Sequence, residues 1–331
     1  MKNPLVSVII PTYNRPNYLQ IAIASVLNQT VQDFEIIVSD DCSSENPEAV
    51  IQAFKDPRIR FRRNATNLGV ARNAMCAFQM AHGKYIASLN DDDVWTEQFL
   101  EKLLPPLENN AELVLSFCDY TVIDATGTIQ PEWTEQQTHQ EKRDRLVEGI
   151  YHSFWEVGLV NQSIFASCAA VLRRAAINVK ELPNAGVFWD YYLVYLACRT
   201  GSAAYYCPER LTHYRKHPQS ENMLSGSRDA QAKIRKGKAG IFCYEQFATQ
   251  APEPWIQKYF WQEWAHANTT IAIGLMLETR IAEVRLHLMR SLRQQPFNLR
   301  TLIASILSYI PQSIAVPISH LRDPGLLSRA R

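Results

Sequence analysis

The sequence predicts an α/β fold, with helices on both faces of a largely parallel sheet and a helical C-terminal extension. Two patterns support this prediction: short apolar runs that end in polar clusters, and helix-period segments between those runs. A third is the change to long helical stretches after about residue 226. With 331 residues, the chain is long enough for about two domains. Ligands of such sheets bind at the carboxyl ends of the strands.

Apolar runs mark the expected strands. In the first 120 residues they are 5–10 (LVSVII), 34–39 (FEIIVS), 85–89 (YIASL) and 113–117 (LVLSF). Short and nearly continuous apolar runs are typical of parallel strands that are buried on both faces. A later run, 169–174 (AAVLRR), predicts a further strand, after a less regular region that spans 121–186.

Helical periodicity fills the gaps between these runs. Apolar residues repeat at helix spacing over 19–27 and over 70–81, where Gly83 follows as a C-terminal cap. A third helix is expected to begin at Thr96 and to end or kink at 105–106, where two prolines stand together. A helix over 190–198, a loop over 213–217 and long helices up to residue 292 complete the prediction.

Composition excludes several classes of protein. Lys and Arg total 34 against 33 Asp and Glu, so a general nucleic-acid binder is not expected. The 7 cysteines are odd in number and form no Cys-x-x-Cys pair, which favours a reducing compartment. No apolar stretch reaches 18 residues and no signal peptide is apparent, so we expect a cytoplasmic protein.

An acidic tract, Asn90 followed by Asp91, Asp92 and Asp93, comes directly after the predicted strand 85–89. Adjacent carboxylates repel one another unless a cation or an array of N–H groups offsets their charge. Mg²⁺ or Mn²⁺ suits such oxygen ligands and could bridge to a diphosphate. The alternative is a solvated acidic turn that caps the next helix.

Further polar clusters follow the other strands. Asp40 and Asp41 could bond a nucleobase or a ribose, or could cap a helix. In residues 11–15 (PTYNR), Tyr13 could stack on a base and Arg15 could approach a phosphate. Residues 67–73 (NLGVARN) enter a helix whose N-terminus favours an anion. Neither Gly-x-Gly-x-x-Gly nor a P-loop occurs, which counts against dinucleotide oxidoreductases and P-loop NTPases.

Asp190 lies among aromatic residues, and a carboxylate in apolar surroundings can serve as a base because burial raises its pKa. A helix-starting aspartate is the alternative. His213 and His217 have a zinc-like spacing but no second pair of ligands nearby, so structural zinc is not expected. Arg215 and His217 instead suit contacts with an anion or a metal–diphosphate.

Together these segments resemble family 2 glycosyltransferases, inverting enzymes with the GT-A fold. The segments VSVIIPTYNR, SVLNQTVQDFEIIVSDDCS, NLGVARN, KYIASLNDDDVW and YRKHPQS follow the family's order over residues 4–222. The resemblance implies a GT-A (nucleotide-diphospho-sugar transferase) catalytic domain over 1–222 and a helical extension over 223–331. It also implies a nucleotide-sugar donor, most often a UDP-sugar, and a divalent metal, Mg²⁺ or Mn²⁺.

By position, the resemblance assigns roles to individual residues. Asp41 would hold the uracil edge, and Asp91 would contact the ribose or the donor sugar. Asp92, with Asp91 beside it, would ligate the metal, and Asp190 would be the catalytic base. The remaining donor-binding residues would be Pro11, Thr12, Tyr13, Arg15, Asn67, Arg72, Arg215 and His217.

Two departures from the family pattern leave alternatives open. Asn90 stands where the family commonly has an acidic residue, and Trp189 stands where a Glu often precedes the base. The alternatives are a sugar nucleotidylyltransferase, which would favour a glycine-rich loop after the first strand, and an inactive nucleotide-sugar-binding scaffold subunit. The acceptor would be a glycan, a lipid-linked sugar or a protein. Residues 299–321 could lie at a membrane surface beside a lipid-linked acceptor, or could form an ordinary packed helix.

Overall fold

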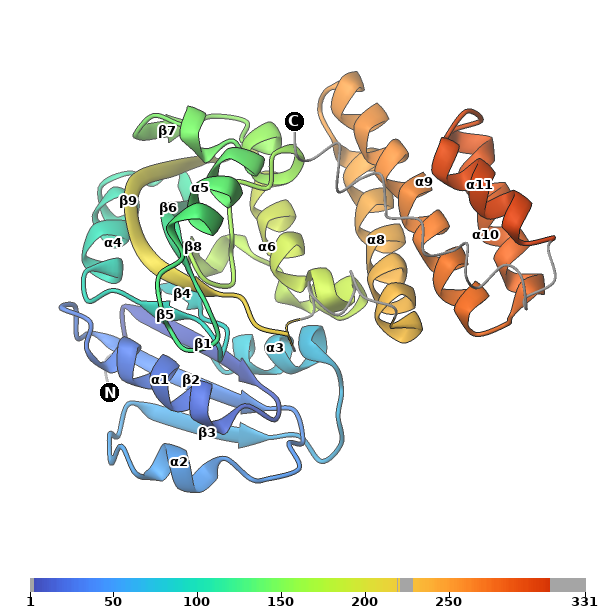
Figure 1. The fold of residues 1–331 in the computed structure, drawn as a ribbon. Helices are drawn as coiled ribbons and strands as arrows, with labels where there is room; N and C mark the ends of the chain where they lie inside the picture. Colours follow the sequence, from blue (N-terminus) through green and yellow to red (C-terminus); the bar gives the residue numbers. More distant parts are fainter. Residues whose placement is uncertain (1–2, 219, 221–228, 310–331) are drawn as a thin grey trace. The chain divides into compact units, whose positions relative to one another are not determined.

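The computed structural model describes residues 3–218, 220 and 229–309, and these residues divide into two compact units. The first unit contains residues 1–183 and 189–216, and the second contains 184–188 and 217–331. The GT-A-like α/β architecture that the sequence predicts is confirmed by a mixed central sheet with helices (Figure 1).

The central sheet of the first unit contains nine strands among the described residues. Its order is β3-β2-β1-β4-β8-β6-β9-β5, with β7 paired to β9. The parallel part is β3 (Ile59–Arg63), β2 (Phe34–Asp40), β1 (Val6–Thr12) and β4 (Tyr85–Ser88). The register aligns Thr12 with Asp40, so both strands end at the same edge. The polar clusters that follow these two strands therefore begin at the same edge of the sheet.

The other strands continue the sheet beyond β4. Strand β8 (Ala170–Arg173) runs antiparallel to both β4 and β6, so β4 and β6 have the same direction. Strand β6 (Leu113–Ile123) pairs in parallel with β9 (Ala203–Arg215), the long curved strand in Figure 1. Short strands β5 (Val94–Trp95) and β7 (Gly149–Tyr151) both pair antiparallel with β9.

Helices of the first unit bury apolar stripes against this sheet. They are α1 (Pro16–Leu27), α2 (Glu48–Gln52), α3 (Val70–Phe78), α4 (Phe99–Asn109), α5 (Pro131–Gln140) and α6 (Trp189–Cys198). Short helical turns are η1 (Arg143–Arg145), η2 (Glu156–Val160), η3 (Arg174–Ala176) and η4 (Val179–Phe188), and residues 184–188 of η4 belong to the second unit. The core combines the first strands with Leu19 and Ile23 of α1 and Leu103 of α4, all without exposed surface.

Several boundaries differ from the sequence prediction. Helix α4 begins at Phe99 and not at Thr96, and it continues through Pro105 and Pro106. The burial of Leu103, Leu104 and Leu107 in one stripe outweighs the two backbone donors that the prolines remove. Most of the expected loop over 213–217 is the end of β9.

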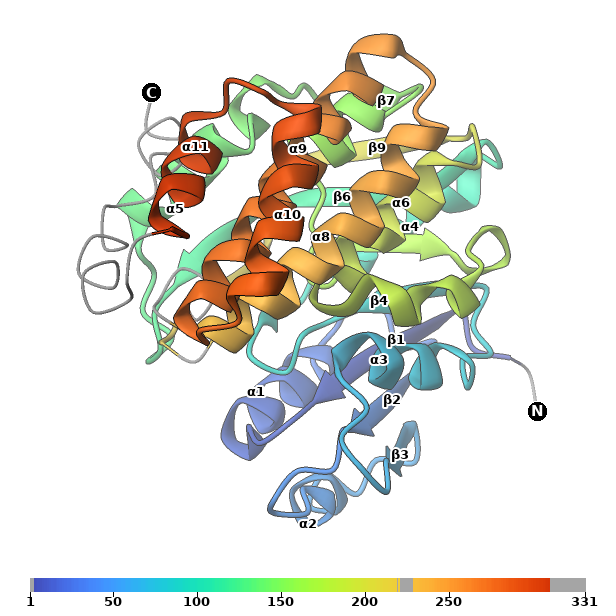
Figure 2. The same cartoon turned by 90° about the vertical axis from the view of Figure 1, so that its right-hand side faces the viewer.

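The second unit contains four described helices: α8 (Ala230–Gln250), α9 (Pro254–Leu277), α10 (Ile281–Gln294) and α11 (Leu299–Leu307). Each packs on the next, and Figure 2 shows them side by side. Gly237 allows α8 to approach α9 closely, because a Cβ there would lie 2.4 Å from a side-chain carbon of Ile271. No helix of the described residues is both long and apolar enough to cross a bilayer.

Candidate active site

The carboxyl ends of β1 and β4 are joined by the Asp91 carboxylate. Thr12 Oγ1 donates to Asp91 Oδ2 over 2.7 Å, and the backbone N–H of Tyr13 donates to the same oxygen over 3.3 Å. Arg15 Nη1 lies 3.0 Å from Asp91 Oδ1 and 2.8 Å from Asp92 Oδ2. The structure thus brings Thr12, Tyr13, Arg15 and the acidic tract into one cluster, because adjacent parallel strands end at one edge.

The charge of the acidic tract is only partly balanced. Burial, followed by the neighbouring Asp92 carboxylate, raises the pKa of Asp91 to about 6. The same two causes, burial first, raise the pKa of Asp93 well above its usual value. Carboxylates that resist ionisation in this way favour an added positive charge, so the donor chemistry fits a hard divalent cation. Asp91 is already held by three groups of β1 and its loop, which leaves Asp92 as the better candidate ligand.

Arg215, at the end of β9, donates hydrogen bonds to two residues of the acidic tract. Its backbone N–H donates to Asp93 Oδ1 over 2.9 Å, and its Nε donates to the backbone oxygen of Asp92 over 2.7 Å. The guanidinium is 4.8 Å from the ring centre of Tyr18. Since Arg215 is buried, its first role in this structure is to hold the turn that carries Asp92 and Asp93.

Asp41 shapes the loop between β3 and α3. Its Oδ1 accepts from Asn64 Nδ2 and from the Leu68 N–H, and its Oδ2 accepts from the Gly69 N–H, each over 2.8 Å. Gly69 has φ 82° and precedes the first residue of α3, which suits a glycine. The carboxylate expected to hold a uracil edge is therefore 3% exposed and bonded within the protein.

The other predicted donor-binding residues have mixed exposure. Tyr13 is 46% exposed beside the acidic tract, so its ring face is accessible to a base, whereas Pro11 and Thr12 are buried beneath it. Asn67 and Arg72 are exposed on the loop and the first turn of α3. His217 is buried and belongs to the second unit, and its role at a diphosphate stays a prediction.

Asp190 is the second residue of α6 and is linked to the acidic tract through Ser167, a residue that the sequence did not indicate. The Ser167 hydroxyl donates to Asp190 Oδ2 over 3.0 Å, and Asn90 Nδ2 donates to Ser167 Oγ over 3.1 Å. Burial raises the pKa of Asp190 above its usual value, as a base requires. Trp189, which precedes Asp190 in the sequence, is buried, and its ring centre lies 6.2 Å from that of Phe78.

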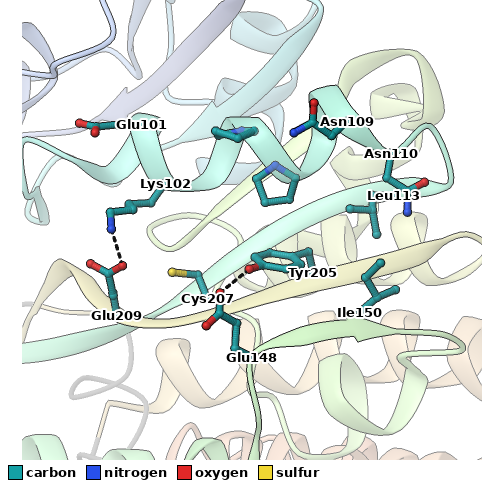
Figure 3. A pocket seen from close by; sticks show the side chains of 12 residues that line it. Glu101, Lys102, Asn109, Asn110, Leu113, Glu148, Ile150, Tyr205, Cys207 and Glu209 are labelled. Atoms are coloured by element: carbon teal, nitrogen blue, oxygen red, sulfur yellow. Dashed lines mark hydrogen bonds and ion pairs between the residues drawn. The ribbon is translucent and has the colours of Figure 1, made fainter.

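A hollow of about 500 Å³ lies elsewhere in the first unit, between α4 and the strands β6, β7 and β9 (Figure 3). It includes Leu113, the first residue of β6, and therefore lies toward the amino ends of the strands. Four of its polar residues form two pairs, Lys102 Nζ with Glu209 over 2.7 Å and Tyr205 Oη with Glu148 over 2.6 Å. The catalytic candidates gather at the opposite ends of the strands.

Comparison with known proteins gives the chemical context. The family model for glycosyl transferase family 2 matches residues 7–178. A putative teichuronic acid biosynthesis glycosyltransferase of Bacillus subtilis is 28% identical over 64% of this chain and 79% of its own length. An Escherichia coli UDP-Glc:alpha-D-GlcNAc-diphosphoundecaprenol beta-1,3-glucosyltransferase is 35% identical over 39% of this chain and 51% of its own length.

Coverage of the relatives is uneven. An uncharacterized glycosyltransferase of Methanocaldococcus jannaschii is 40% identical, and the chain matches 49% of its length. The chain thus spans about half the length of several curated relatives that it matches.

Solved structures share the fold at low sequence identity. S. aureus TarS 1-349 in complex with UDP-GlcNAc has a TM-score of 0.53 and 13% identity, covering 88% of this chain and 92% of its own. Mannosyltransferase PcManGT from Pyrobaculum calidifontis, in complex with GDP-Man and Mn²⁺, also has a TM-score of 0.53 and 13% identity. That match covers 100% of this chain and 87% of the mannosyltransferase.

Proposed function

Because this chain belongs to glycosyl transferase family 2, we propose that it transfers a sugar from a UDP-sugar to an acceptor hydroxyl with inversion. The observation that carries this proposal is the cluster at the carboxyl edge of the sheet. Thr12, Arg15 and Asp91 converge there, and Asn90 and Ser167 connect the tract to Asp190. The residues that we propose for binding the donor and for accepting the proton therefore belong to one hydrogen-bonded network.

In this proposal Asp190 is the general base. The acceptor hydroxyl oxygen attacks the anomeric carbon and loses its proton to the Asp190 carboxylate, while the bond from that carbon to the diphosphate oxygen breaks. A positioned base contributes roughly 10²- to 10⁴-fold to such a step. A single displacement inverts the anomeric centre, so a second carboxylate acting as nucleophile is not required.

The donor-binding residues take the following parts. Tyr13 offers a ring face to the base, and Pro11 and Thr12 form the floor beneath it. Asn67 and Arg72 lie at the N-terminus of α3, where an anion is favoured. Asp41 acts on the nucleotide through the loop that it holds. Arg215 and His217 complete the donor-binding set.

Asp92, with Asp91 beside it, would hold a divalent cation, Mg²⁺ or Mn²⁺. When bound, that cation supplies positive charge to the diphosphate leaving group. Within the described residues, no group of three or more His, Cys, Asp or Glu side chains is arranged for a metal. The acidic tract would therefore depend on the diphosphate oxygens of the donor to complete the coordination.

A donor screen tests the proposed function. UDP-, GDP- and dTDP-sugars are compared by thermal shift with and without Mn²⁺, because a ligand specific for the folded state raises apparent stability. The sugar that binds is then incubated with acceptors, and UDP release is expected. Formation of UTP from the UDP-sugar and pyrophosphate would indicate a nucleotidylyltransferase. Binding of UDP and Mn²⁺ without turnover would indicate a scaffold subunit.

We assign the catalytic domain to residues 1–222 and the helical extension to 223–331, and we propose that the segment 299–321 lies at a membrane surface beside a lipid-linked acceptor. Phe297, Leu299 and Ile306 are 93%, 66% and 65% exposed, and Met289 is 52% exposed. The exposed arginines of α10, including Arg285, supply charge complementary to anionic lipids. The rest of the segment 299–321, from residue 310 onward, lies outside the described residues.

Liposome flotation tests this membrane proposal. The full chain is expected to float with vesicles that contain anionic lipid, and Leu299→Ser combined with Ile306→Ser is expected to reduce the floated fraction. The described part of the segment also packs on its neighbours through Thr301 and Ala304. Equal flotation of the wild type and the double variant would support a purely structural helix.

A further inference from the structure

Ser167 and Asn90 form a hydrogen-bonded chain that ends on the Asp190 carboxylate. Ser167 Oγ lies 3.0 Å from Asp190 Oδ2 and 3.1 Å from Asn90 Nδ2. The backbone N–H of Asn90 also donates to the backbone carbonyl oxygen of Ser167 over 3.0 Å, which fixes the two residues against each other. Ser167 is 1% exposed. Asn90 and Asp190 are half-buried, and the burial of Ser167 between them strengthens these hydrogen bonds.

The amide of Asn90 sets the direction of this chain. Its Nδ2 also donates to Asp93 Oδ2 over 3.1 Å, which orients the amide nitrogen toward both partners. A hydroxyl that accepts from an amide N–H keeps its own proton for another acceptor, and here that acceptor is Asp190 Oδ2. An aspartate at position 90 has no proton to give when ionised, and it would compete with Asp190 for the Ser167 proton.

We propose that Ser167, oriented by Asn90, is the positioning residue that holds the Asp190 carboxylate in the geometry for accepting the acceptor's proton. The inference rests on the proposed function, since it takes Asp190 as the base. The second oxygen of Asp190 accepts from the Tyr191 N–H over 2.8 Å. With one hydrogen bond on each oxygen, the plane of the carboxylate is fixed before the acceptor arrives.

The hydrogen bonds of Asn90 suit an amide and not an ionised carboxylate. Asn90 lies between Ser167 and Asp93, and it donates to both from one nitrogen. A charge at this position would add to the repulsion within the acidic tract. Asn90 therefore supports the proposed base from within the tract.

Ser167→Ala tests the proposal, with Ser163→Ala as the matched control. Ser163 is equally buried, at 1% exposure, but its hydroxyl donates to the Glu141 backbone oxygen and not toward Asp190. Loss of a hydrogen bond to a charged group should lower kcat roughly ten- to hundredfold in Ser167→Ala, with UDP affinity unchanged. The control should keep near wild-type turnover. Wild-type turnover in a folded Ser167→Ala protein would overturn the proposal.

A double variant separates positioning from a general loss of structure. If Ser167 acts through Asp190, then Ser167→Ala should cost little further rate in an Asp190→Asn background. A full additional loss in that background would contradict the proposed route. The sugar-transfer rate at a saturating donor concentration is measured for the wild type, the two single variants and the double variant.

A carbon NMR titration of the Asp190 carboxyl group tests the inference without a measurement of sugar transfer. The Asp190 carboxyl signal, assigned by its loss in Asp190→Asn, should titrate at higher pH in Ser167→Ala, because the charged form loses a donor. Burial, the Tyr191 N–H and the backbone N–H of Asp190 itself also act on the pKa of Asp190, and the substitution removes none of them. An unchanged titration overturns the inference even if the wild type transfers no sugar, whereas a shifted titration without transfer would overturn only the proposed function.

Discussion

Asp41→Asn distinguishes a loop-shaping role from direct recognition of the nucleobase. In the structure the Asp41 carboxylate accepts three hydrogen bonds of 2.8 Å, from Asn64, Leu68 and Gly69. An asparagine can offer its oxygen to only one side, so its NH₂ group would face an N–H donor on the other. With the amide oxygen kept toward Asn64 and Leu68, the hydrogen bond from the Gly69 N–H to a charged group is lost, and that N–H keeps only Asn67 Oδ1 as an acceptor, at 3.1 Å.

The size of the effect follows from these contacts. A hydrogen bond to a charged group contributes about 1.5–3 kcal/mol. We therefore expect the free energy of opening the loop that carries Leu68 and Gly69 to fall by about 2–3 kcal/mol. A protein with an overall stability of about 5–15 kcal/mol should still fold. Since 1.4 kcal/mol corresponds to a tenfold change, exchange of the Leu68 or Gly69 amide should accelerate by roughly thirty- to a hundredfold or more.

Hydrogen exchange of the peptide that contains Leu68 and Gly69 is the assay, carried out without nucleotide. Asn46, an exposed residue that bonds only Glu48 within its own turn, provides the control variant Asn46→Asp. Exchange in that control should be unchanged at residues 68 and 69. If Asp41→Asn leaves this exchange unchanged and weakens only UDP binding, then the loop-shaping role is wrong and direct base contact is supported.

Two predictions concern stability. Gly83→Ala should destabilise the first unit by about 1–3 kcal/mol or more, because a Cβ would lie 2.5 Å from the Ser7 backbone nitrogen; an unchanged thermal midpoint would contradict this. For Glu35, burial opposes ionisation, but hydrogen bonds from the His82 N–H, Ser7 and Arg60 outweigh it and hold its pKa below the usual range. Glu35 therefore stabilises the fold above the unfolded-state pKa of about 4.3, and this stability is lost as the pH falls through the lowered value. Unfolding of Glu35→Gln should be less pH-dependent there; an identical pH profile would refute the role.

The first strands and the site edge were predictable from sequence because their signals are local. Apolar runs marked β1, β2 and β4, and the runs of β1 and β4 ended in the polar residues that form the cluster. Strand β3 was missed because its sequence, IRFRR, alternates with arginines whose side chains are partly exposed at the edge of the sheet. Strand β9 was partly read as a loop, since its last residues carry charges that become buried only against β6 and the acidic tract.

Ser167 could not have been found by local reasoning. Its partners Asn90 and Asp190 lie 77 and 23 residues away in sequence. The pairing of β4 with β8 brings Asn90 beside Ser167, and helix α6 supplies Asp190. The role of Asp41 has the same origin, because its partners arrive on the loop after β3. Sequence patterns identify which residue types gather at a sheet edge, whereas the direction of each hydrogen bond depends on tertiary contacts.

Sugar transfer by a folded Asp190→Asn protein tests the central claim most directly. The substitution keeps the volume and leaves the donor cluster of residues 11–15 and 90–93 intact. It removes the proton acceptor and one of the two hydrogen bonds, from Ser167 and from the Tyr191 N–H, that the carboxylate accepts. UDP binding should stay near the wild-type value, while kcat should fall roughly 10²- to 10⁴-fold. Near-normal transfer with normal UDP binding would contradict the account and leave the base unassigned.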